Sequence, residues 1–174
     1  RCRLVGSEMC IRDSSSAAGW FLPFALPICL YICYTDMKGM RIPNHAVVAL
    51  FAVYAVVGLV SLPLPAYIWA YLHLVVVLVA GIALNAGGAL GAGDAKFAAA
   101  AAPFVHLGDL RLLMALFAAN LLAAFVTHRI ARHTPLRRLA PGWESWHRGW
   151  DFPMGLSLGA TLAIYIGLGI RYGA

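Results

Sequence analysis

LGAGDAKF, residues 90–97, lies inside a long apolar region rich in alanine, and its Asp94 is the only acidic residue between Asp36 and Asp109. The whole chain is 62% hydrophobic and only 11% charged, with a mean hydropathy of +0.80. This composition is typical of a membrane protein with several spans and not of a soluble domain. An acidic residue beside a membrane segment costs free energy and usually serves a function, so the same stretch also predicts a functional site.

Six apolar segments are candidates for membrane-spanning helices, each of which needs about 20 mostly apolar residues. Proline, glycine or charged residues separate them, and they cover residues 17–35, 45–62, 67–86, 94–107, 110–130 and 153–170. The fourth is short and contains Pro103, which should bend or end its helix about two turns after Asp94. We therefore expect an all-α polytopic membrane protein with about six transmembrane helices, four or five also being possible.

Basic residues collect on one side of this topology. If the first helix enters from outside, the loops 36–44, 87–96 and 129–152 share one side and carry Lys38, Arg41, Lys96, Arg129, Arg132, Arg137, Arg138 and Arg148. The opposite side keeps only Arg111 and Arg171. An excess of lysine and arginine marks the cytoplasmic side, where both Asp36 and Asp94 would then lie. Contact with membrane lipid accounts for the net charge of +6, so no nucleic-acid partner is expected.

Two segments stand apart from the spans. Residues 1–14, RCRLVGSEMCIRDS, resemble translated sequencing-adapter sequence, so we expect a non-native leader followed by a single integral-membrane domain over 15–174. The polar linker at about 131–152 spaces Trp143, Trp146 and Trp150 at i, i+3 and i+7, which places them on one side of a helix. We interpret this linker as an interfacial helix at headgroup level. A lid over a cytoplasmic active site is the alternative.

The first acidic motif is TDMKGMRIPN, residues 35–44, at the end of the first predicted span. Pro43 disfavours helical geometry in the residue before it, and Asn44 is suited to cap the helix that follows. Lys38 lies two residues beyond Asp36, on another side of the helix. We expect its ammonium group to reach lipid phosphates and so hold the acid at the interface.

The second motif is GAGDAKF, residues 91–97. Gly91 and Gly93 leave the backbone bare just before Asp94, so another chain can approach it closely. Lys96 repeats the spacing of the first motif and is expected to reach lipid in the same way. Taken alone, Asp94 could simply be the N-terminal cap of a helix, and Asp36 could simply mark the end of one.

Two carboxyl groups at one membrane face suit acid–base chemistry. Like-charge repulsion and partial burial allow such a pair to share one proton, so one group acts as base and the other as acid. The ionised group activates a water and the protonated group assists amide cleavage, which is aspartic proteolysis. The four cysteines form no CxxC pair and no His/Cys ligand spacing. We therefore expect neither a metal nor a cofactor.

Together the two motifs resemble the prepilin peptidase family, membrane aspartic proteases of the GxGD type that are distantly similar to presenilin and signal peptide peptidase. Residues 91–94 match GxGD and Lys96 matches the lysine that commonly follows. The first motif matches the D-x-K-x-x-x-I-P-N pattern of the family through Asp36, Lys38, Ile42, Pro43 and Asn44. FPMGLSLGATL, residues 152–162, is similar to the family's final helix, which begins with a proline, here Pro153.

The resemblance implies a catalytic pair, Asp36 and Asp94, in the bacterial cytoplasmic (inner) membrane. Its substrate would be the leader of a type IV prepilin or pseudopilin, cut after a glycine, with Gly91 and Gly93 making room for the extended segment. Larger relatives carry two CxxC pairs linked to N-methylation, so this chain resembles the peptidase-only branch that serves tight-adherence (Flp) pili. A proton-coupled transporter or channel and a non-catalytic assembly subunit remain alternatives. Nothing in the sequence indicates an oligomeric state.

Overall fold

The computed structural model describes residues 7–148 and 152–172, and every regular element in this part of the chain is helical. The α-helices are α1 (Ser7–Gly39), α2 (Asn44–Ser61), α3 (Leu64–Ala86), α4 (Ala92–Ala101), α5 (Leu110–His133) and α6 (Met154–Tyr172). Four short 3₁₀ turns join them, namely η1 (Ala102–Phe104), η2 (Leu107–Asp109), η3 (Pro135–Leu139) and η4 (Glu144–Trp146). The first six residues of the predicted leader lie outside the described part, and α1 begins within the rest of it.

Five of the helical segments are long and apolar enough to cross a membrane. They cover Ser16–Gly39, Asn44–Ser61, Leu64–Ala86, Leu107–His133 and Met154–Tyr172. The predicted fourth span overlaps α4, which has only ten residues and is therefore about 15 Å long, half of a typical hydrocarbon core. Pro103 follows it inside a 3₁₀ turn, as expected of a residue that cannot continue an α-helix. The prediction of an all-α membrane protein with four to six spans is confirmed.

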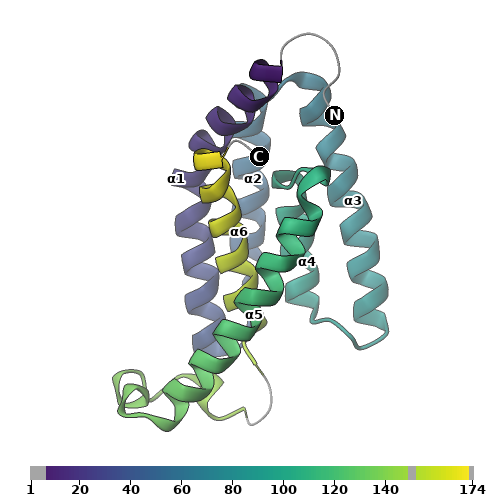
Figure 1. Ribbon diagram of the computed structural model, residues 1–174. Coiled ribbons are helices and arrows are strands. Elements are labelled where there is room, and N and C mark those ends of the chain that lie inside the picture. Colours follow the sequence, from purple (N-terminus) through teal and green to yellow (C-terminus); the bar gives the residue numbers. More distant parts are fainter. Residues whose placement is uncertain (1–6, 149–151, 173–174) are drawn as a thin grey trace.

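Helices α1 and α6 pack along each other through small residues (Figure 1). A Cβ atom at Gly159 would lie 2.8 Å from the Cys33 sulfur and 2.9 Å from the Cys29 carbonyl oxygen. Only glycine permits this approach, and Gly155 precedes Gly159 by four residues, the small-xxx-small spacing that packs helices in lipid. Both cysteines are free thiols and lie within this contact.

The short helix α4 lies against α3, α2 and α6, whereas α5 packs mainly on α6. The contact with α3 is close, because a Cβ at Gly81 would lie 3.0 Å from that of Ala95. Further along the bundle, the buried Tyr54 ring stacks between Phe21 and Tyr67 at centroid distances of 5.8 and 5.7 Å. This aromatic cluster joins α1, α2 and α3, so α4 sits against a packed framework.

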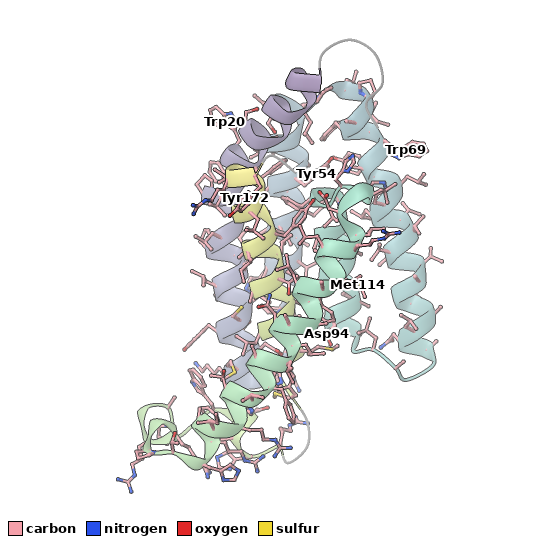
Figure 2. All side chains as sticks on the ribbon, in the orientation of Figure 1. Trp20, Tyr54, Trp69, Asp94, Met114 and Tyr172 are labelled. Atoms are coloured by element: carbon pink, nitrogen blue, oxygen red, sulfur yellow. The ribbon has the colours of Figure 1, made fainter. Side chains whose placement is uncertain are left out.

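Two features of the surface fit a lipid environment. Large apolar side chains such as Val60 and Leu122 point outward on the spanning helices, where a bilayer would cover them. Trp20, Trp69 and Tyr172 are exposed on three helices and lie in the upper half of Figure 2. Aromatic side chains of this kind are enriched at membrane–water interfaces.

The opposite end of the bundle, at the bottom of Figure 1, gathers both acidic motifs. Helices α1, α3 and α5 end there, while α2, α4 and α6 begin there. This basic end therefore brings together the two motifs, the start of α6 and the basic linker after α5. The two ends of the molecule differ in charge as the sequence predicts.

The linker differs from its prediction, because no α-helix forms between His133 and Arg148. The described residues contain the two 3₁₀ turns η3 and η4, and the Trp146 indole N–H donates to the Ala140 carbonyl oxygen at 2.9 Å. Trp143 and Trp146 still stack, with ring centroids 5.8 Å apart. Trp150 lies outside the described residues.

Candidate active site

Asp36 lies one turn before the end of α1, and its side chain is turned into the contact with α6. The residue is only 5% exposed. One carboxylate oxygen, Oδ2, accepts the backbone N–H of Gly155 at 2.7 Å. This N–H group belongs to the first turn of α6, where backbone donors have no partner within their own helix. Asp36 thus caps a helix distant from it in sequence.

Gly155 makes this contact possible. A Cβ atom there would lie 3.0 Å from both Cγ and Oδ2 of Asp36, so a larger residue would displace the carboxylate. Pro153, which the family resemblance singles out, is fully buried just before α6 begins. Sequence reasoning did not place Gly155 in the site. The available signal was a glycine two residues after the proline that opens the last helix.

Asp94 lies in the first turn of α4, which begins at Ala92 with Gly91 at the N-cap position. No side-chain cap hydrogen bond forms there, so Asp94 is not the cap of this helix. Its Oδ2 atom would lie only 2.6 Å from a Cβ on Gly91. The carboxyl group therefore occupies space that only a glycine at position 91 leaves open. Burial raises the pKa of Asp94 above its ordinary value.

Gly93 and Lys96 connect the second motif to the first. A Cβ at Gly93 would be in contact with Ile42 at 3.4 Å, so this part of α4 lies directly against the loop between α1 and α2. Lys96 donates from Nζ to the Asn44 side-chain oxygen at 3.2 Å. The predicted cap role of Asn44 is wrong, because α2 begins at Asn44 itself and Pro43 occupies the N-cap position without a side-chain hydrogen bond.

The other residues of the first motif shape the turn between α1 and α2. Pro43 has φ −72° and ψ 138°, which ends the loop in an extended conformation before α2. Met40 has φ 50°, in the left-handed region that side chains other than glycine rarely adopt. Lys38 is exposed and its ammonium group lies 5.7 Å from the centre of the Tyr34 ring. It therefore takes no direct part in the contact between the motifs.

The fold brings the two acids to the same end of the bundle. Asp36 is close enough to Asp94 for their negative charges to repel each other, and Figure 2 shows Asp94 in the lower half of the molecule. The linker packs against α1 and α5 at this end of the bundle. The ring centroids of Trp143 and Tyr34 are 6.1 Å apart, and the stacked rings of Trp146 and His128 have centroids 5.0 Å apart. Among the described residues, no group of three or more His, Cys, Asp or Glu side chains could hold a metal ion.

Comparison with known proteins places this arrangement in one family. The sequence pattern of the type IV leader peptidase family matches residues 24–128, which include both acidic motifs and α2 to α4. No curated protein and no solved structure matches the chain. The matched region covers more than half of the 174 residues. The chain therefore belongs to the type IV leader peptidase family.

Proposed function

We propose that this protein is an aspartic endopeptidase that removes the leader peptide of type IV prepilins or pseudopilins at the cytoplasmic face of the bacterial inner membrane. The observation that supports this most directly is that Asp36 and Asp94, from different helices, lie close enough for their charges to interact. They stand at the end of the bundle where α1 ends and α4 begins. The family supplies the class of reaction. The excess of Lys and Arg at the same end supports the cytoplasmic orientation.

The chemistry follows from two carboxyl groups that hold one proton between them. The ionised carboxylate takes a proton from a water molecule while the water oxygen attacks the scissile carbonyl carbon. The protonated carboxyl group hydrogen-bonds the carbonyl oxygen and transfers its proton as a tetrahedral diol forms. The carboxyl group that took the proton from water then gives it to the amide nitrogen, and the C–N bond breaks as the other carboxylate takes a proton from a diol hydroxyl. The new carboxylic acid and the amine then leave. The pair ends with the single proton with which it began.

The surroundings of Asp94 suit an extended substrate. Gly91 is exposed and Gly93 is half-buried, and the only side chain between them is the methyl group of Ala92, so the backbone just before Asp94 carries little side-chain bulk. We propose that the leader segment lies along this turn, with the glycine before the cut close to the two acids. The exposed apolar helices leave room for the hydrophobic part of the prepilin to remain in the membrane.

The test is cleavage of a purified prepilin in liposomes by three single variants of the full chain. Asp36→Asn and Asp94→Asn each keep the side-chain shape and remove the ability to ionise, so each should lower kcat/KM by about a hundredfold or more. Asp109→Asn is the matched control, because Asp109 accepts the Tyr165 hydroxyl at 2.8 Å, far along α6 from the site. We expect it to retain cleavage.

Two results would reject the proposal. Full cleavage by Asp36→Asn or by Asp94→Asn would exclude the two-carboxylate mechanism. If the unchanged protein in liposomes left prepilin intact while restoring pilus assembly in cells, it would be a non-catalytic assembly subunit. Insertion of each variant in the membrane is checked by protease protection, so that loss of activity is not confused with loss of folding.

A further inference from the structure

The linker between α5 and α6 has no part in the proposed mechanism, yet it is packed into the protein. Trp146 is only 4% exposed, and its indole N–H donates to the Ala140 carbonyl oxygen within the linker itself. A tryptophan that anchors a protein to lipid keeps its apolar ring in the membrane and its N–H toward the headgroups. The Trp146 ring and N–H have partners in the protein instead, so lipid anchoring does not explain this residue.

A series of aromatic rings connects the linker to two helices. The Trp146 indole stacks on the His128 imidazole of α5 at 5.0 Å, and the Trp143 indole stacks on Trp146 at 5.8 Å. Trp143 in turn meets the Tyr34 ring of α1 edge-on at 6.1 Å. We call these four residues the aromatic brace. It lies beside the lower end of α1 in Figure 1 and ties this end to α5.

The aromatic brace also touches the segment that opens α6. Phe152 lies edge-on to the His128 ring, with centroids 5.9 Å apart, and it precedes Gly155 by three residues. The Gly155 N–H donates to Asp36, which follows Tyr34 by two residues. Both partners of this hydrogen bond are therefore close in sequence to a ring that belongs to the brace or contacts it.

We propose that Trp143 and Trp146 are positioning residues, which hold Asp36 against the Gly155 N–H by fixing the end of α1 relative to the start of α6. This inference rests on the proposed function, because it concerns the geometry of the same catalytic pair. Both tryptophans act through Asp36 and not by contact with the substrate. Their effect on the reaction is large because a shift of about 1 Å in a reacting group can cost about a hundredfold in rate.

The end of α1 is held from two sides. Tyr34 and Asp36 are two positions apart, so their side chains point about 200° apart around the helix. Helix α6 packs on the side of Asp36, and the linker packs on the side of Tyr34. Helix ends open locally where few buried contacts hold them. Loss of the linker contact would therefore loosen the last turn of α1, which carries Asp36.

A movable lid would be packed differently. Lids are drawn from segments with few buried contacts, whereas Ser145 is 0%, Trp146 4% and His128 5% exposed. The backbone N–H of Trp146 also donates to the Trp143 carbonyl oxygen at 3.3 Å. Burial and internal hydrogen bonding favour a fixed brace over a lid that opens for each substrate.

Cleavage of purified prepilin in liposomes by variants of the full chain tests the brace. Trp146→Ala removes the ring that contacts both His128 and Trp143. We expect kcat to fall about tenfold and KM to stay within about twofold, because the substrate still binds while the acids are misplaced. Trp146→Phe keeps a ring in the stack and should recover most of kcat. Trp20→Ala is the matched control and should change neither constant, since Trp20 is an exposed tryptophan at the other end of α1.

A second measurement needs no substrate. Cys33 lies three residues before Asp36, and its thiol contacts the Leu156 carbonyl oxygen of α6 at 3.5 Å. Labelling of this thiol by N-ethylmaleimide therefore reports how tightly α1 and α6 are packed beside Asp36. The other cysteines of the full chain are first replaced by alanine, namely Cys2, Cys10 and Cys29. Trp146→Ala should speed the labelling by about threefold or more, because local opening exposes the thiol, and Trp20→Ala should leave its rate unchanged.

The proposal is overturned if Trp146→Ala raises KM at unchanged kcat, because the linker would then bind the substrate. It is also overturned if Trp146→Ala leaves Cys33 labelling unchanged, or if Trp20→Ala lowers kcat equally, as expected of a lipid anchor. If Trp146→Ala does not insert correctly, Tyr34→Ala decides by the same two measurements, since Tyr34 is 49% exposed and its replacement leaves the tryptophan stack in place. Full cleavage by Asp36→Asn removes the proposed function, whereas Cys33 labelling still tests the brace.

Discussion

The contact between Lys96 and Asn44 predicts that the two acidic motifs are energetically coupled. The Lys96 Nζ atom donates to the Asn44 side-chain oxygen at 3.2 Å, and this bond joins the helix of Asp94 to the first residue of α2, just after the loop that follows Asp36. A hydrogen bond with a charged donor contributes about 1.5–3 kcal/mol when protected from solvent. Both residues are exposed, which reduces the contribution to about 0.5–1 kcal/mol. At 1.36 kcal/mol for each factor of ten, this corresponds to about two- to fivefold in kcat/KM.

The assay is a double-mutant cycle with Lys96→Met and Asn44→Ala, measured as prepilin cleavage in liposomes. Each single variant should lose about two- to fivefold, and the double variant should lose no more than either one, because the same bond is removed only once. Lys38→Met is the matched control. Lys38 lies over the Tyr34 ring, so its effect should multiply with that of Asn44→Ala. Multiplicative losses for Lys96→Met and Asn44→Ala would refute the coupling.

Three further predictions follow from the turn after α1, from Asp94 and from the linker. Met40→Gly should stabilise the protein by about 1 kcal/mol, because glycine adopts φ 50° without strain. The unfolding midpoint in detergent should therefore rise by about 2–4 °C, and an unchanged or lower midpoint would contradict this prediction. Because burial raises the pKa of Asp94 in the folded protein, its contribution to stability should fall as pH rises from about 3.9 through the folded pKa. Asp94→Asn should remove this loss, and the same pH dependence in both proteins would exclude the explanation. Trp146→Ala removes the stack on His128 and the hydrogen bond to the Ala140 carbonyl oxygen. Trypsin should therefore cut this variant faster than the unchanged protein after Arg137 and Arg138. Equal cutting rates in the two proteins would show that Trp146 does not hold the linker in place.

Local patterns in the sequence predict the features that depend on composition and short spacing. The apolar segments predict the helices, and Pro103 predicts the end of α4, because a missing N–H and a fixed ring act within one turn. The two aspartates emerge as site candidates because acids are rare in so apolar a chain. Their family motifs name the same residues. The functional roles of these residues stay predictions.

Long-range contacts explain what the sequence does not predict. The bond between Gly155 and Asp36 joins residues 119 positions apart, so no local pattern reports it. Asn44 has the chemistry of a helix cap, yet the ammonium group of Lys96 from another helix takes its oxygen. The tryptophan spacing in the linker is helical, but it follows a turn at Pro141 and Gly142 and continues only into the 3₁₀ turn Glu144–Trp146.

The most direct measurement of the central claim is chemical cross-linking of positions 36 and 94, the two proposed catalytic positions. In a full chain whose native cysteines are replaced by serine, Asp36→Cys and Asp94→Cys are combined and treated in liposomes with a short bifunctional thiol reagent. Because the two carboxyl groups lie within electrostatic range, we predict rapid intramolecular cross-linking. Asp36→Cys combined with Asp109→Cys should give none, since Asp109 lies beside Tyr165, far along α6. Equal cross-linking of the two pairs, or none in the first, would contradict the account.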